Sequence, residues 1–140
     1  MMTKDKLEQY YGISSNIEAI EEEIQTLYNP VSSPNGRPME GHSNTPSNPT
    51  ERNAMRILHL KEQCEAERER MYALLEEIEA WLLTVKDTEI VSIIRWKYLL
   101  RLDWKRVNMK VYGYPDYWYA RKRLIRYFER LTKNGKEQDI

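Results

Sequence analysis

The chain has 140 residues, of which 41% are hydrophobic and 31% are charged, and its formal net charge is zero. This length allows one ordinary domain or a small domain with an extension, and the high charged content favours long solvated helices over a thick core. No apolar run approaches the roughly 20 residues of a membrane-spanning helix, and MMTKDKLEQYY lacks the apolar stretch of a signal peptide. We therefore expect a soluble, cytoplasmic protein without membrane contact.

Two N-terminal segments, residues 4–28 and 51–87, have apolar residues at alternating spacings of three and four. This is the spacing of a coiled-coil-like seam, and it predicts an antiparallel hairpin of two helices while leaving parallel self-association open. Lys61 and Arg68 interrupt the second seam. Because both segments are acidic, we do not expect their exposed faces to bind DNA. The predicted seam residues are Tyr10, Ile13, Ile17, Ile20, Ile24 and Leu27, and Ile57, Cys64, Met71, Leu75, Ile78, Leu82 and Val85.

Residues 29–50, NPVSSPNGRPMEGHSNTPSNPT, contain five of the six prolines and interrupt the helical pattern. This composition predicts an exposed or disordered linker within an acidic N-terminal region that spans residues 1–87. His42 in the linker has no partners for a metal site, and Cys64 stands at an apolar position where a buried thiol is the default. The sequence also lacks a phosphate-cradling glycine loop. We expect no catalytic residue, no metal and no cofactor, and hence no enzyme.

The zero net charge hides an uneven distribution along the chain. Residues 1–87 contain nine basic and sixteen acidic residues, whereas residues 88–140 contain thirteen and six. The basic half is also the aromatic half. This division indicates a C-terminal region that faces nucleic acid.

The C-terminal region, residues 88–132, has the pattern of a helix-turn-helix domain. Its first helix is predicted from TEIVSIIRWKYLL, with an inward stripe of Ile90, Ile94 and Tyr98. A short helix is expected at 104–112 and a longer one at 116–131, followed by a polar tail at 133–140. The fold class is therefore all-α, with a long-helix hairpin before the helix-turn-helix domain.

Three residues predict how the last two helices are joined. The carboxylate of Asp103 can accept the free N–H groups of the short helix as its N-cap. Gly113 stands where that helix should stop, and Pro115 suits the first turn of the next one. The inward residues predicted for the two helices are Trp104, Val107, Val111, Ala120, Leu124 and Phe128.

The outward residues of these two helices combine positive charge with aromatic rings. In a helix-turn-helix the N-terminal part of the second helix enters the major groove, where Arg and Lys reach guanine edges or phosphates. The N–H groups at the start of the short helix also favour an anion. For Trp118 two roles remain open, a DNA contact or packing against the acidic helices. The predicted set for double-stranded DNA is Lys105, Arg106, Tyr117, Trp118, Arg121, Lys122 and Arg126.

The stretch IIRWKYLLRLDWKRVNMKVYG, followed by YPDYWYARKRLIRYFERL, resembles the C-terminal region of the RinA/ArpU-type phage transcriptional regulators. Those regulators are in turn similar to the sigma-factor region that binds the −35 element. The motif match covers about residues 88–131. It implies a DNA-binding regulator of late genes in phages or prophages of Gram-positive bacteria, with 116–131 as the reading helix. The chain departs from the family pattern where Pro115 and Asp116 start this helix, and the carboxylate of Asp116 would repel phosphate.

Two other functions fit the same sequence. A phage small terminase subunit also joins a helix-turn-helix to a helical oligomerisation region, and it would form a ring. A coiled-coil adaptor would show no salt-dependent DNA binding. For a regulator, a single helix-turn-helix buries little DNA surface. We therefore expect host RNA polymerase as a partner, or a homodimer or other homo-oligomer formed through the N-terminal helices.

Overall fold

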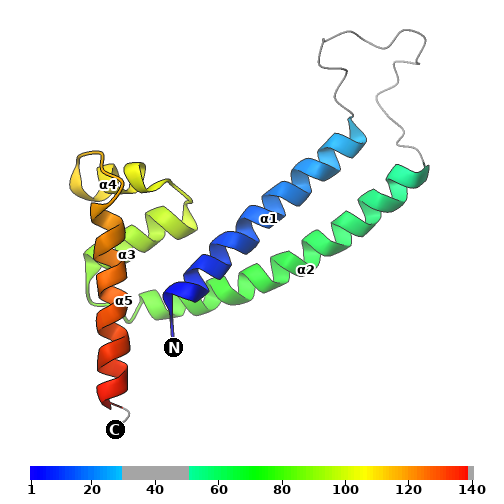
Figure 1. The fold of residues 1–140 in the computed structure, drawn as a ribbon. Coiled ribbons are helices and arrows are strands. Elements are labelled where there is room, and N and C mark those ends of the chain that lie inside the picture. The colour runs from blue at the N-terminus through cyan, green and yellow to red at the C-terminus, as the bar shows by residue number, and fades with distance from the viewer. Residues whose placement is uncertain (30–50, 139–140) are drawn as a thin grey trace. The chain divides into compact units, whose positions relative to one another are not determined.

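The computed structural model describes residues 1–29 and 51–138, and in this part of the chain all regular structure is helical. The prediction of an all-α fold that begins with two long helices is confirmed. The predicted linker, with His42, lies outside the described residues except for Asn29. The elements are α1 (Lys4–Tyr28), α2 (Glu51–Leu82), α3 (Thr88–Ile94), the π-helical turn η1 (Arg95–Leu99), α4 (Trp104–Tyr112) and α5 (Tyr119–Gln138) (Figure 1).

The chain divides into two compact units, and both long helices contribute to each of them. The larger unit consists of Met1–Gly12 and Tyr72–Ile140, and the smaller unit is Ile13–Met71. This division differs from the predicted boundary at residue 87, because the start of α1 and the end of α2 pack with the C-terminal helices. Among the described helices, none combines the length and the apolar character that crossing a membrane requires.

In the smaller unit, α1 and α2 pair in an antiparallel manner along one apolar seam, as predicted (Figure 1). Lys61 and Arg68, which interrupt the seam in the sequence, are exposed and reach across to α1. Lys61 Nζ donates to the hydroxyl of Tyr28 at 3.0 Å, and Arg68 forms an ion pair with Glu21. The buried residues of this seam are Ile13, Ile17, Ile20, Ile24, Ile57, Leu60 and Cys64, and all but Leu60 were predicted.

The larger unit has a core that is closed to solvent. Helices α3, α4 and α5 pack against one another, with η1 against α3 and α4. Trp81, near the end of α2, stacks on Phe128 of α5 with ring centroids 5.8 Å apart. The predicted stripe of Ile90, Ile94 and Tyr98 is buried. The side chains with 0% exposure include Ile90, Ile93, Ile94, Tyr98, Val107 and Leu124.

The helix that begins at Thr88 does not continue as a regular α-helix, because it widens into the π-helical turn η1. Leu100 N donates to Arg95 O at 2.9 Å, five residues back. Tyr98, four residues after Ile94, keeps to the inward side across this turn and is buried. Its hydroxyl donates to Glu8 Oε1 at 2.8 Å. Burial, and then the carboxylate of Glu8, raise the pKa of the Tyr98 phenol.

The last helix begins and ends later than predicted. It starts at Tyr119 rather than at residue 116, and it continues to Gln138 rather than ending at 131. The carboxylate of Asp116 accepts the Trp118 N–H at 2.7 Å. Such a local bond holds the backbone in a turn instead of a helix, which explains the late start. Pro115 therefore lies in the connecting segment and not in the first helical turn.

Candidate nucleic-acid interface

Helix α4 begins and ends at the residues that the sequence predicts. Asp103 is its N-cap, with Oδ1 accepting the Arg106 N–H at 2.8 Å. Gly113 ends the helix in the left-handed conformation, with φ of 86°, and its N–H donates to Met109 O at 2.9 Å. Because the Asp103 carboxylate already occupies the Arg106 N–H, the start of α4 offers less to an anion than the sequence suggested. The cationic side chains of Lys105 and Arg106 remain exposed.

The connection between α4 and α5 is held by a residue that the sequence analysis missed. Asn108 is fully buried and is the only buried polar residue in the described part of the chain. Its Nδ2 donates to Tyr114 O at 2.9 Å, and its Oδ1 accepts the Ala120 N–H at 3.0 Å. One side chain therefore fixes both ends of the segment between Gly113 and α5. The signal in the sequence is an Asn at an inward position next to Val107.

All seven residues of the predicted DNA-binding set are exposed. Lys105 and Arg106 lie on α4, and three further cations lie on α5. Tyr117 and Trp118 were expected on the last helix, but they lie in the segment that precedes it. The α5 members are Arg121, Lys122 and Arg126.

Two of the cations lie over the two exposed rings of this set. Lys105 Nζ is 5.7 Å from the ring centroid of Tyr117, which brings α4 and the connecting segment together. The guanidinium of Arg121 is 5.4 Å from the ring of Trp118. Trp118 is 57% exposed, so its ring lies on the surface of the larger unit rather than in its core. A cation over an aromatic face stabilises both side chains by a modest amount at such an exposed site.

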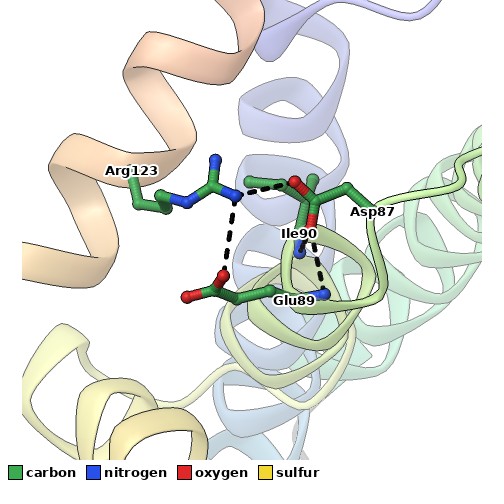
Figure 2. A network of polar contacts seen from close by, with 4 residues as sticks. All are labelled: Asp87, Glu89, Ile90 and Arg123. Carbon is green, nitrogen blue, oxygen red and sulfur yellow. Dashed lines mark hydrogen bonds and ion pairs between the residues drawn. The ribbon is translucent and has the colours of Figure 1, made fainter.

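Arg123, in contrast, is neutralised inside the larger unit (Figure 2). Its Nη2 lies 2.7 Å from Asp87 Oδ2 and 3.5 Å from Glu89 Oε2. Asp87 is also the N-cap of α3, because its Oδ1 accepts the N–H groups of Glu89 and Ile90 at 3.1 and 3.3 Å. Burial by itself would raise the pKa of Asp87, but the Arg123 hydrogen bond and these two N–H groups together hold that pKa below its usual range. This network fixes α5 to the start of α3.

Other basic residues of the C-terminal half are also engaged within the larger unit. Arg95 forms two hydrogen bonds with the carboxylate of Glu79, at 3.2 and 3.1 Å. Lys97 lies over the rings of Tyr11 and Trp104, at 4.9 and 5.1 Å. By comparison, the described side chains form no ion pair with Arg106, Lys122 or Arg126. These three cations lie on the exposed sides of α4 and α5.

The described residues were also compared with the side-chain groups that bind metal ions and with the surroundings of a reactive cysteine. They contain no group of three His, Cys, Asp or Glu side chains that could hold a metal ion. Cys64 is a buried free thiol on the seam of the smaller unit, as predicted. Exposure and charge instead distinguish the predicted DNA-binding set, which we call the α4–α5 surface. Its members are Lys105, Arg106, Tyr117, Trp118, Arg121, Lys122 and Arg126.

Comparison of the chain with family models, with curated proteins and with solved structures finds no significant match. The resemblance to phage regulators consequently rests on the quoted motif alone.

Proposed function

We propose that this protein binds double-stranded DNA through the exposed cations of α4 and α5 and the rings of Tyr117 and Trp118, and that it acts as a transcription regulator. One observation carries the proposal. The cations and aromatic rings that a helix-turn-helix would present to DNA are all exposed, on two helices and on the segment between them, which is fixed by Asn108. A rigid connection favours recognition because little conformational entropy is lost on binding.

The roles of the cations follow from their places on the two helices. Arg121 and Lys122 lie in the first turn and a half of α5, the part that enters the major groove in helix-turn-helix proteins. There they would contact guanine edges or phosphates. Lys105 and Arg106, at the start of α4, would meet the phosphate backbone, and Arg126 would extend the contact along α5. The carboxylate of Asp116 is held by the Trp118 N–H, which ties its charge to the connecting segment.

The biological setting of this proposal comes from the resemblance. From it we infer a phage or prophage regulator of late genes that acts in the cytoplasm of a bacterial host. One helix-turn-helix covers little DNA, so we infer that a second copy of the chain or host RNA polymerase supplies further contacts. A mass measurement on the intact chain, alone and with duplex DNA, separates these cases. A ring of many subunits would favour a small terminase instead.

The first test is binding of the full chain to a fluorescently labelled duplex of mixed sequence, followed by anisotropy at several salt concentrations. Each phosphate contact releases counterions, so the logarithm of the affinity should fall linearly with the logarithm of salt, with a slope of about −0.9 per phosphate. Binding that is absent, or that does not respond to salt, would contradict the proposal and favour a protein-interaction adaptor.

The second test removes the two groove-facing cations. Arg121→Ala with Lys122→Ala should weaken duplex binding by at least about tenfold, at roughly 1–3 kcal/mol for a base contact, and should reduce the salt slope if either cation contacts a phosphate. The matched control is Arg56→Ala with Arg70→Ala, which removes the same charge from α2, where each arginine pairs with a glutamate. Equal affinity of the two double variants would show that the α4–α5 surface is not the DNA contact.

A further inference from the structure

Aromatic side chains are exposed from residue 114 to the first residue of α5. Four aromatic side chains between residues 114 and 119 are exposed by 45 to 58%. Only two of them, Tyr117 and Trp118, belong to the predicted duplex-binding set. We call this group the aromatic turn; its members are Tyr114, Tyr117, Trp118 and Tyr119.

The backbone that carries these rings is fixed by hydrogen bonds. Asn108 binds the carbonyl of Tyr114 and the N–H of Ala120, at 2.9 and 3.0 Å. The Asp116 carboxylate accepts the N–H of Trp118 at 2.7 Å. The aromatic turn is therefore held in place before any ligand arrives, which lowers the entropy cost of binding.

The outer two rings rest on a third tyrosine. The ring of Tyr119 meets that of Tyr112 edge to face, with centroids 4.8 Å apart. The ring of Tyr114 lies 6.4 Å from the same Tyr112 ring, at an angle of 42°. Burial, and then the neighbouring carboxylate of Glu89, raise the pKa of Tyr112. The Tyr112 ring is therefore a shared support for its two neighbours.

The inner two rings are accompanied by cations. Lys105 Nζ lies over Tyr117 and the Arg121 guanidinium over Trp118, at 5.7 and 5.4 Å from the ring centroids. Lys122, the next cation along α5, is exposed. Each of these two rings therefore has a cation over one face, and aromatic rings together with cations on one surface match a ligand that carries both flat bases and phosphates, as in single-stranded nucleic acid.

We infer that the aromatic turn stacks on unpaired bases, so that the protein prefers single-stranded or locally opened DNA to a closed duplex. In a closed duplex the faces of the bases are covered by their neighbours, and only their edges are accessible in the grooves. The face of a ring can stack on a base only when that base has left the stack. This preference rests on the proposed nucleic-acid binding, and it specifies that the aromatic turn binds DNA whose bases are unpaired.

The test compares three labelled probes with the full chain: oligo(dT), a mixed-sequence duplex, and the same duplex with an internal stretch of mismatches. The variants are Tyr114→Ala and Tyr119→Ala, singly and together, because neither ring belongs to the set assigned to duplex binding. Each should weaken binding to oligo(dT) and to the mismatched duplex by about 5- to 150-fold, the range measured for one base–aromatic stack. Binding to the closed duplex should not change.

Tyr72→Ala is the matched control, since Tyr72 is 57% exposed on α2 and does not belong to the aromatic turn. It should leave binding to all three probes unchanged. Far-UV circular dichroism of each variant checks that the fold is intact. Ala at position 119 is compatible with the first turn of α5, because Ala is the best helix former.

The outcomes separate this inference from the proposed function. Normal duplex binding with no loss on oligo(dT) in the double variant would overturn the inference and leave the proposed function standing. An equal loss on all three probes would also overturn it, because the rings would then support the whole surface. Loss of self-association, seen as a lower mass in the double variant, would assign the rings to a protein contact. If the unaltered chain binds none of the probes, both proposals fail.

Discussion

The two units of this chain bury their apolar residues in different ways. In the smaller unit the seam between α1 and α2 leaves every buried residue slightly accessible, with exposures of 3 to 7%. In the larger unit the side chains of Ile94, Val107 and Leu124 are completely closed off. Two helices alone cannot surround a side chain, whereas α3, η1, α4 and α5 enclose it from several directions.

This difference shows where the molecule can hold a surface rigid. In the smaller unit, ion pairs connect the two helices at the edges of the seam, such as that between Glu23 and Arg56 at 2.6 Å. Exposed ion pairs of this kind stabilise a fold only a little. The larger unit combines a closed core with a buried polar residue, Asn108, that fixes a turn. The candidate nucleic-acid interface lies on this unit.

The largest expected effect comes from the same truncation made in both units. Ile94→Ala should lower the free energy of unfolding by about 4 kcal/mol, because a closed core cannot collapse around the cavity. Ile24→Ala, in the seam, should cost only about 2 kcal/mol, because two helices can move together. Urea denaturation followed by circular dichroism measures both. Equal losses would mean that the seam is packed as tightly as the C-terminal core.

The second prediction concerns the buried amide. Asn108→Ala should cost about 2–3 kcal/mol, because it leaves the buried Ala120 N–H without a partner and also removes the hydrogen bond to the Tyr114 carbonyl. Asn108→Leu is the companion variant, since it keeps the volume and removes only the hydrogen bonds. Both should weaken DNA binding by loosening the start of α5. A loss below about 0.5 kcal/mol in Asn108→Ala would show that the turn is fixed by other contacts.

The smallest expected effect lies where α3 and α5 meet. Asp87→Ala should cost about 1–2 kcal/mol at neutral pH, since it removes the N-cap of α3 and the ion pair with Arg123. Asp87→Asn keeps a capping oxygen, and it should cost only about 0.5 kcal/mol because the ion pair is partly exposed.

The effect of Asp87 should also depend on pH in one direction. Its pKa is lower in the folded chain than in the unfolded chain, so its stabilising effect is complete above the unfolded value of about 4. That effect is lost as the pH falls through the folded value. Denaturation curves from pH 7 to pH 2 should therefore show the unaltered chain and Asp87→Asn converging in acid. A constant difference across that range would contradict this account.

The sequence predicts those features that depend on neighbours along the chain. The spacing of Ile13, Ile17 and Ile24 identified the seam, and Asp103 and Gly113 marked the ends of α4, because seams and caps are set within a few residues. The exposure of the cations on α4 and α5 followed from the same periodicity. Whether these residues bind DNA stays a prediction.

Other features depend on contacts between distant segments, and the sequence did not reveal them. Tyr98 was expected in the core, but its hydrogen bond to Glu8, ninety residues away along the chain, was not. The late start of α5 depends on one local bond from Asp116 that competes with helical hydrogen bonding. The role of Asn108 appears only once α4 and α5 lie side by side. Periodicity identifies an inward position, but it does not say which groups a polar residue will meet there.

The bond between Asn108 and Ala120 has a consequence for the timescale on which the molecule opens. The first N–H groups of a helix have no partner within the helix, and helix ends fray, so these protons usually exchange quickly with solvent. The Ala120 N–H is buried and held by Asn108 Oδ1 at 3.0 Å. Its proton should therefore exchange as slowly as those in the middle of α5, since both are released only when the packing of α4 against α5 is lost. This single amide would then report how often the connection between the two helices opens.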